Sequence, residues 1–418
     1  MRIVRHIYAF VAAILLLTAL SCSKEGGREP SLPKMSGDEV VFYVGSANSP
    51  QSKAAARLTS GDSLMTYGGG FAIYGAYHTA PSFPGTTENK PQSLFYNIPV
   101  ERDDEVIPPS DASVDAHPWH TVPTIYWPYV GKVSFFAYAP YNADRDSLVV
   151  TTRYDTAEYP QLTFTPNPKA TKQVDLLTGI ALNKTGAEGE AVYRVGKGYV
   201  DMDLYHQLTW IDFRAKASYE GTTEQFNSWL NSNFGSGTCV GVSSITLTGI
   251  LSSNTGTYAD PSSVTRGFTW ENPSYDASKY NGEYILSVEG GELKSPSHAP
   301  LASTESFNEG YTVIVEGDGD GNNTENGLLY LLPQTLPSTA RLKVEYGIFK
   351  TDSGDPLMLY SASFNIGDLP DGKNIWGPGK HIRYQLTLPL TEISKATITA
   401  NVTDWEIGHN YDHGTYLE

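Results

Sequence analysis

The sequence of 418 residues is poor in cysteine, with only Cys22 and Cys239. If Cys22 is modified as argued below, no disulfide can form within the chain. An exported protein without disulfides must draw its stability from an apolar core. The chain is long enough to bury such a core, and its length favours two domains over one.

Basic residues are also scarce, because 29 Lys and Arg stand against 46 Asp and Glu and give a formal net charge of −17. This charge argues against nucleic acid as a partner and against attraction to anionic membrane surfaces. Charged residues of both signs make up only 18% of the chain, which is low for a helical protein with solvated faces.

An apolar run without charge, from Ile7 to Leu20, follows two arginines at the N-terminus. It is shorter than the roughly 20 residues of a membrane-spanning helix, and the arrangement is typical of a secretory signal. The run leads through Thr-Ala-Leu-Ser into Cys22, which resembles a bacterial lipobox with Ala19 where that motif prefers Leu. The resemblance implies that residues 1–21 are removed and that a lipid on Cys22 anchors the protein in the cell outer membrane.

The alternative for this segment is an ordinary cleaved signal with an incidental cysteine. Residues 22–37 lack an apolar pattern in either case, so we expect a flexible tether between the membrane and the fold. The protein is therefore expected as a lipoprotein exposed at the cell surface.

The composition favours β-structure, since the chain contains 27 Tyr, 15 Phe and 7 Trp together with 39 Gly and 26 Pro. Aromatic residues favour strands, whereas Gly and Pro end elements and form turns. Short apolar or alternating segments predict strands at 39–46, 70–77, 132–139, 160–165, 174–182, 199–217, 242–251, 283–289, 310–316, 327–332, 340–349, 357–366, 381–390 and 396–403.

One helix is expected over about residues 222–233. Thr222 and Gln225 match a capping box, and Phe226, Trp229 and Leu230 follow at helical spacing. One helix among so many strands cannot supply the crossovers of a parallel sheet, so the pattern predicts an all-β protein of sandwich type with very little helix.

A small and polar stretch at 184–198 predicts a domain boundary. We expect an N-terminal β-sandwich domain at 38–190 and a C-terminal β-sandwich domain at 191–418.

Short segments follow one another in a characteristic order along nearly the whole chain. They are RLT (57–59), GD (61–62), FAIYG (71–75), YWP (126–128), VSFFAYAP (133–140), VDLL (174–177), YHQL (205–208), LPQ (332–334), WGPGK (376–380) and VTDW (402–405). This order, together with the lipobox, resembles that of the fimbrillins, the subunits of type V pili.

The resemblance implies two tandem transthyretin-like antiparallel β-sandwich domains and a role in assembly rather than catalysis. In this family an Arg-specific protease cuts the lipidated precursor in the loop after its first strand. The first strand leaves, and a strand of another subunit fills the groove by donor-strand exchange. The resulting fimbrium adheres to host or bacterial surface receptors. By the same resemblance, 381–390, 396–403 and the tail 406–418 are candidate donor segments.

The first predicted strand can host this mechanism. Its apolar residues point to both faces, with Val40, Phe42 and Val44 on one and Val41 and Tyr43 on the other. A strand of this kind is typically buried between layers. Another strand could replace both its side-chain burial and its ladder hydrogen bonds.

The loop after this strand, residues 48–57, is small, polar and rich in turn formers, which favours proteolysis. Arg57 is the only arginine in it, so the Arg57–Leu58 bond is the candidate cleavage site. The alternative is an anchor or tip subunit that keeps its first strand.

A rival hypothesis is a surface glycan-binding lipoprotein that does not polymerise. Four aromatic residues, Trp119, Tyr126, Trp127 and Tyr129, could form an exposed platform for sugars, although packing in the core is the commoner role of such clusters.

Catalytic and metal sites are weakly supported by the sequence. Ser63 lies in a Gly-Asp-Ser-Leu motif of hydrolases, with Asp203 and His206 downstream, but no flanking helices support an α/β site. His117 and His120 lack a third firm metal ligand. The acidic loop at 316–326 departs from an EF-hand and is read as a hairpin loop. We therefore expect no enzyme activity, no cofactor and no metal.

Overall fold

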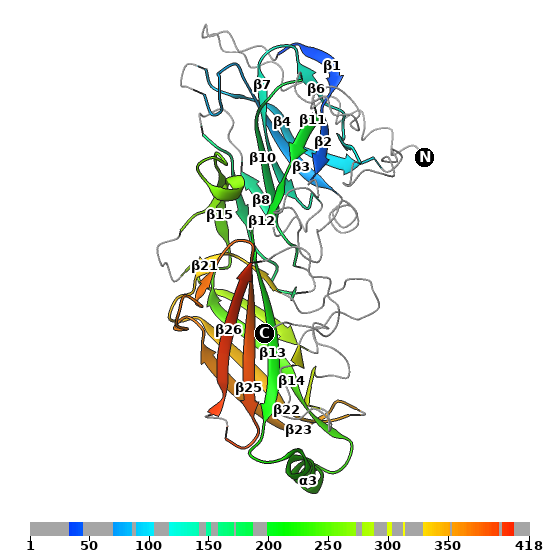
Figure 1. Ribbon diagram of the computed structural model, residues 1–418, viewed down its shortest axis with the longest axis vertical. Helices are drawn as coiled ribbons and strands as arrows, with labels where there is room; N and C mark the ends of the chain where they lie inside the picture. The colour runs from blue at the N-terminus through cyan, green and yellow to red at the C-terminus, as the bar shows by residue number, and fades with distance from the viewer. Residues whose placement is uncertain are drawn as a thin grey trace, which may run out of the picture. The chain divides into compact units, whose positions relative to one another are not determined.

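The computed structural model describes residues 33–44, 70–85, 89–103, 117–141, 148–151, 158–170, 173–186, 199–272, 278–287, 299–302, 312–313, 329–351, 353–392 and 395–404. Residues from Met35 onward form one compact unit. Within the described ranges the protein is mostly strands, with a single α-helix, α3 (Thr223–Phe234) (Figure 1). The predicted all-β class is confirmed. None of the helices in these ranges is long and apolar enough to cross a membrane.

An eight-stranded sheet contains most of the strands in the N-terminal half. Its order is β11 (Tyr199–Met202), β2 (Val41–Val44), β5 (Trp119–Thr121), β4 (Gln92–Arg102), β3 (Phe71–His78), β7 (Lys132–Ala139), β10 (Leu177–Lys184) and β12 (Leu204–His206). Neighbouring strands are antiparallel except for β11 and β2, which are parallel. A separate pair joins β1 (Met35–Glu39) to β6 (Tyr126–Pro128).

Two five-stranded sheets form the C-terminal half (Figure 1). The first contains β19 (Thr312–Val313), β13 (Thr209–Ser218), β25 (Lys380–Pro389) and β26 (Thr397–Asp404), with β20 (Leu329–Leu331) also on β13. The second contains β17 (Gly282–Ser287), β14 (Thr238–Ile250), β22 (Arg341–Lys350) and β23 (Pro356–Asn365), with β18 (Ala299–Ala302) also on β14.

Smaller sheets complete the fold. One has the order β16 (Phe268–Trp270), β15 (Asn254–Tyr258), β9 (Gln161–Phe164) and β8 (Leu148–Thr151), and the 3-10 turn η2 (Thr265–Gly267) precedes β16. The other pairs β21 (Gln334–Thr335) with β24 (Ile375–Trp376).

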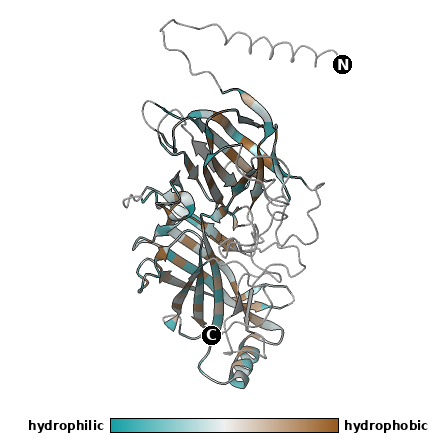
Figure 2. Ribbon diagram, turned by 45° about the horizontal axis from the view of Figure 1, so that its top comes forward, coloured by the Kyte–Doolittle hydropathy of each residue, from teal (hydrophilic) through white to brown (hydrophobic). Residues whose placement is uncertain are grey.

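Three clusters of buried apolar side chains hold these sheets together. The sandwich cluster lies between the two five-stranded sheets and includes residues such as Phe213, Val242, Tyr346 and Tyr384. The first-strand cluster gathers side chains of β2, β3, β4, β5, β6, β7, β10 and β11. The central cluster joins the other face of the eight-stranded sheet to β9, β15 and β16. Figure 2 shows hydrophobic and hydrophilic residues alternating along the strands, which is the pattern of sheets with one buried face.

The predicted single strand at 199–217 is wrong, because this segment forms β11, β12 and β13. β11 and β12 lie at opposite edges of the eight-stranded sheet, and β13 lies in the next sheet. Even-numbered positions from Val200 to Trp210 stay mostly buried across all three strands. The alternation therefore continues although the chain changes its partners.

The predicted helix is confirmed within one residue. The Thr222 side chain accepts a hydrogen bond from the Gln225 backbone N–H, and the Gln225 side chain accepts one from the Thr222 N–H, which completes the capping box. The division into domains at 38–190 and 191–418 and the transthyretin-like topology remain predictions.

Candidate functional site

β2 is paired with other strands along both of its edges. On one side it runs parallel to β11 over four residue pairs, from Val41 opposite Tyr199 to Val44 opposite Met202. On the other side it is antiparallel to β5 at two positions. The N–H of Val40, just before the strand, donates to the Ile125 carbonyl at 3.0 Å.

The predicted strand at 39–46 corresponds to Val40 and β2 and keeps the name first strand, although β1 precedes it in the chain. Its side chains are buried on both faces, as its sequence predicts. Val40 and Phe42 are fully buried in the first-strand cluster. The Phe42 ring meets Phe71 and Phe135 edge-on, with ring centroids 5.9 Å and 5.3 Å apart.

On the opposite face Val41 and Tyr43 are buried as well, and the Tyr43 ring contacts that of Tyr199 at 5.6 Å. Val44 is partly buried against the first-strand cluster. Full burial of one such side chain is worth roughly 1.5–3 kcal/mol. The strand therefore contributes a large share of a typical stability of about 5–15 kcal/mol.

Ionic contacts add little to this attachment. Glu39 Oε1, at the end of β1, lies 2.9 Å from His120 Nδ1, and Asp103 Oδ2 lies 3.8 Å from His120 Nε2. All three side chains are about a third exposed. Solvent screens such pairs, and each contributes about 1 kcal/mol at most. Apolar burial is therefore the main force that holds the first strand.

β11 depends on β2 for its place in the eight-stranded sheet. It is the outermost strand, and β2 is its ladder neighbour among the described strands. Asp203 follows β11, and its burial and the nearby charge of Asp201 raise the pKa of its carboxyl. Because β2 lies between β11 and β5 in the sheet, its loss would expose a free edge on each of them.

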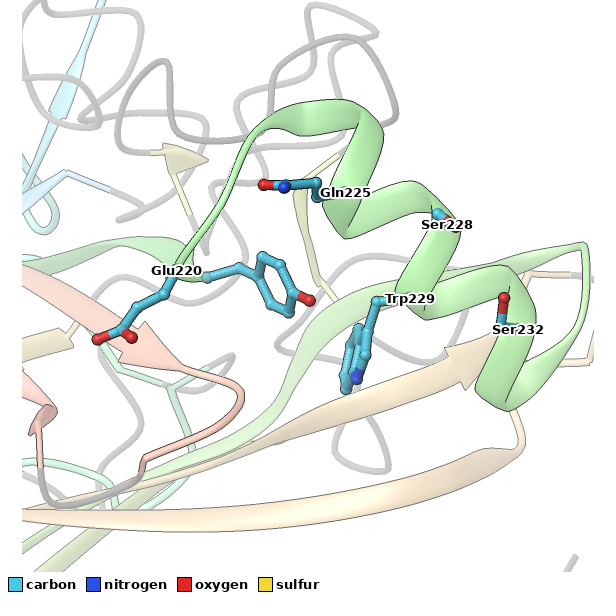
Figure 3. Close-up of a pocket in the computed structure, with 6 residues that line it drawn as sticks. Glu220, Gln225, Ser228, Trp229 and Ser232 are labelled. Atoms are coloured by element: carbon cyan, nitrogen blue, oxygen red, sulfur yellow. The ribbon is translucent and has the colours of Figure 1, made fainter.

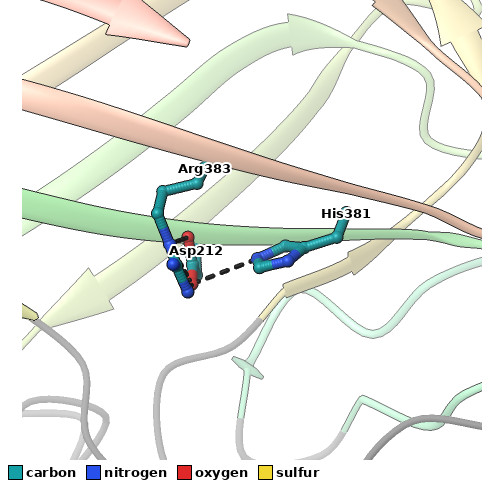
Figure 4. Close-up of polar contacts among 3 residues, drawn as sticks. All are labelled: Asp212, His381 and Arg383. Atoms are coloured by element: carbon teal, nitrogen blue, oxygen red, sulfur yellow. Dashed lines mark hydrogen bonds and ion pairs between the residues drawn. The ribbon is translucent and has the colours of Figure 1, made fainter. Parts of the chain in front are cut away.

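A buried charged cluster joins β13 to β25, which run parallel with Asp212 opposite Arg383 (Figure 4). Arg383 Nη2 donates to Asp212 Oδ2 at 2.6 Å, and His381 Nε2 lies 3.1 Å from the same oxygen. Burial alone would raise the pKa of Asp212, but the His381 and Arg383 contacts outweigh it and lower the pKa. Trp210 stacks on His381 at 3.9 Å. The cluster links the two strands through buried charged contacts.

A family model described as fimbrillin-like matches residues 110–405 of this chain. The chain belongs to the fimbrillin-like family. A fimbrial protein from Bacteroides vulgatus shares its fold, with 19% identity, a TM-score of 0.55 and coverage of 88% of this chain and 100% of that chain.

Two further solved structures are similar at lower TM-scores. A candidate cell adhesion protein from Bacteroides uniformis has 10% identity, a TM-score of 0.40 and coverage of 88% and 98% of the two chains. One from Bacteroides ovatus has 14% identity, a TM-score of 0.42 and coverage of 91% and 100%. No curated protein matches the chain.

Several predicted positions of this fimbrillin-like protein lie outside the described residues. These are the signal and most of the tether with Cys22, the loop with Arg57 and Leu58, Ser63, the acidic loop at 316–326 and the tail after residue 404. The lipid attachment and the cleavage site therefore remain predictions.

The described residues of the alternative hypotheses have structural partners. His206 Nδ1 bonds to buried Asp175 at 2.5 Å, so the carboxylate partner of this nitrogen is Asp175 rather than the Asp203 of the hydrolase hypothesis. His120 faces Glu39 and Asp103 as described above, and the His117 ring contacts the Asp103 carbonyl at 3.3 Å. Within the described ranges, no group of three or more His, Cys, Asp or Glu residues is placed to hold a metal ion.

The aromatic platform of the glycan hypothesis does not form at its predicted place. Trp119 and Trp127 are 1% exposed and belong to the first-strand cluster, whereas Tyr126 and Tyr129 are 42% and 61% exposed. Two of the four rings are therefore core residues, which is the commoner role of such aromatic clusters.

Proposed function

We propose that this fimbrillin-like protein is a pilus subunit for cell adhesion, exported as a lipoprotein through Cys22 and assembled by donor-strand exchange. The observation that carries the proposal is the position of β2 in the eight-stranded sheet, where it is buried on both faces and paired on both edges. The chain immediately after β2 contains the Arg57–Leu58 bond, the proposed cleavage site.

The energetics couple cleavage to assembly. Departure of Val40, Val41, Phe42 and Tyr43 would forfeit the burial of four apolar side chains, together roughly 6–12 kcal/mol as an upper estimate. The emptied groove would also have two unpaired strand edges. A strand from a sibling subunit restores both contributions, so a cut subunit is driven to bind its neighbour.

The pairing pattern also sets the direction of the incoming strand. A replacement that preserves both ladders must run parallel to β11 and antiparallel to β5, as β2 does. Other pilus subunits are thus the proposed partners, the lipid holds the precursor in the outer membrane, and the processed protein belongs to the fimbrium.

The test is limited digestion of purified, delipidated protein with an Arg-specific protease. We expect a cut after Arg57 and loss of the first strand, which mass spectrometry detects. We also expect growth of polymers, which light scattering detects. The matched control is Arg57→Lys, which keeps the charge and removes the protease site. A synthetic peptide of residues 38–46 should cap the groove and stop growth.

A monomer that persists after the first strand has gone would contradict assembly by strand exchange. If the Arg57 bond resists while other arginines are cut, processing at this site is wrong. That result would favour an anchor or tip subunit, or the alternative of a surface glycan-binding lipoprotein that does not polymerise.

A further inference from the structure

A hollow of about 400 Å³ lies beside α3, next to the end of β13 (Figure 3). Its volume falls within the range of about 300–1,000 Å³ found for ligand sites. The lining combines two aromatic rings with one carboxylate, one amide and two hydroxyls, from Tyr219, Glu220, Gln225, Ser228, Trp229 and Ser232. None of these residues belongs to the first strand or its neighbours.

The sequence places these groups on one side of the helix. Gln225, Ser228, Trp229 and Ser232 are spaced three or four residues apart, so they share one face of α3. Figure 3 shows Gln225 reaching from the helix toward the connection that carries Glu220, while the Trp229 ring points from the helix toward the strands of the sandwich cluster. Gly221 permits this approach, because a Cβ at that position would lie 2.6 Å from Gln225 Oε1.

The aromatic wall of the hollow is rigid and partly exposed. The rings of Tyr219 and Trp229 lie 5.3 Å apart, and Trp229 also contacts Phe226 at 6.2 Å and Phe234 at 5.6 Å. Tyr219 and Trp229 pack against the sandwich cluster without being fully buried. A ligand that covers them therefore meets surfaces that are already ordered.

The polar groups are oriented by contacts that leave them available. Gln225 Oε1 accepts the Thr222 N–H at 2.8 Å, so its amide Nε2 can donate to a ligand. Glu220 Oε1 accepts from Lys395 Nζ at 2.5 Å, which leaves its second oxygen as an acceptor. The hydrogen bond and charge of Lys395 also lower the pKa of Glu220, so its carboxylate is charged at neutral pH.

We propose that this hollow binds one neutral sugar unit of a surface glycan. A pyranose has a C–H face that fits a flat aromatic ring and hydroxyls that both donate and accept, which matches the carboxylate, amide and serine hydroxyls present. Three carboxylates nearby, Glu220, Glu224 and Glu392, outnumber the one cation that pairs with two of them, Lys395, and this net negative charge disfavours acidic sugars. The open, polar lining also lacks the deep apolar pocket in which a peptide anchor residue would be buried. The site is independent of the proposed strand exchange.

The test uses saturation-transfer NMR on the mature protein with the methyl glycosides of glucose, galactose and mannose, and with methyl glucuronide as the acidic comparator. We expect transfer to at least one neutral glycoside and weaker binding of the glucuronide. Gln225→Glu keeps the cap acceptor but removes the amide donor, and we expect binding about tenfold weaker or worse. Trp229→Phe keeps the apolar packing and reduces the stacking face, with a similar loss expected.

The matched control is Tyr129→Ala, which removes an exposed aromatic ring in the N-terminal half and should leave binding unchanged. Absence of transfer from all three neutral glycosides overturns the proposal. Equal binding by the wild type and both hollow variants also overturns it, as does a loss of binding in Tyr129→Ala alone. A stronger signal from the glucuronide would refute the choice of a neutral ligand.

Discussion

Truncation of Phe42 tests whether apolar burial holds the first strand in place. The side chain is fully buried and meets two phenylalanine rings edge-on. Phe→Ala substitutions in cores cost about 3–5 kcal/mol, from lost transfer free energy and from the cavity that remains. The two edge-on ring pairs contribute about 0.5–1.5 kcal/mol each to such a loss. We therefore expect Phe42→Ala to lower the free energy of unfolding by about 3–5 kcal/mol.

Two assays measure this effect. Chemical denaturation gives the change in the free energy of unfolding. In protein cut after Arg57, the release rate of the first strand is followed by mass spectrometry or by a dye on the strand. If the Phe42 contacts are lost before the transition state of release, a loss of 3 kcal/mol raises this rate by about two orders of magnitude.

Phe213→Ala is the matched control. Phe213 is equally buried and stacks on Tyr384 at 5.8 Å, but it belongs to the sandwich cluster. It should reduce stability by a similar amount without accelerating release of the first strand. A cost below about 1 kcal/mol for Phe42→Ala would refute the burial argument. Equal release rates in the two variants would refute the assignment of this strand as the one held by the first-strand cluster.

Three further predictions concern buried polar groups. Burial, with a contribution from Lys132, lowers the pKa of His78 below 6.5. The stability that neutral His78 contributes is therefore complete above pH 6.5 and is lost as the pH falls through the lower pKa of the folded state. Melting curves between pH 7.5 and 5 should show a melting temperature that falls with pH, and His78→Gln should reduce this dependence. Burial raises the pKa of Cys239 to about 11, so in a Cys22→Ser background iodoacetamide at pH 8 should react slowly with native protein and quickly in denaturant. Asp212→Asn should cost about 3–5 kcal/mol in chemical denaturation, because Arg383 loses its buried charged partner, while Asp355→Asn at an exposed position should change stability by less than about 0.5 kcal/mol.

The strands that the sequence predicted best are those whose apolar pattern matches their burial. The segment at 132–139 is β7 with unchanged bounds, and both of its faces are buried in the first-strand and central clusters. The alternation at 381–390 agrees with β25 to within one residue, because one face of that strand lies in the sandwich cluster. The capping box likewise located α3, since its signal lies within four residues.

Other strands carry no such local signal. No strand is predicted at the position of β4, which contains Pro99 and has Asn97 in a left-handed conformation with φ of 51°. Its burial is also irregular along the strand. The β13–β25 cluster could not be predicted because Asp212 and Arg383 are 171 residues apart and meet only through the parallel register. Likewise, nothing in the sequence separates buried Trp127 from its exposed neighbour Tyr126, because the three-residue strand that contains them is too short to show a period.

The division of the core explains how this fold could release a strand and survive. Val40 and Phe42 belong to the first-strand cluster alone. The central cluster uses the opposite face of the eight-stranded sheet through residues such as Tyr74 and Phe136, and the sandwich cluster contains no residue of β2, β5 or β11. Loss of the first strand therefore removes contacts from one cluster and leaves the other two with their own. In a single continuous core, the same loss of roughly 6–12 kcal/mol would be comparable to the whole stability of a typical domain. In the proposed strand exchange, the two remaining clusters would keep the rest of the fold packed until another strand arrives.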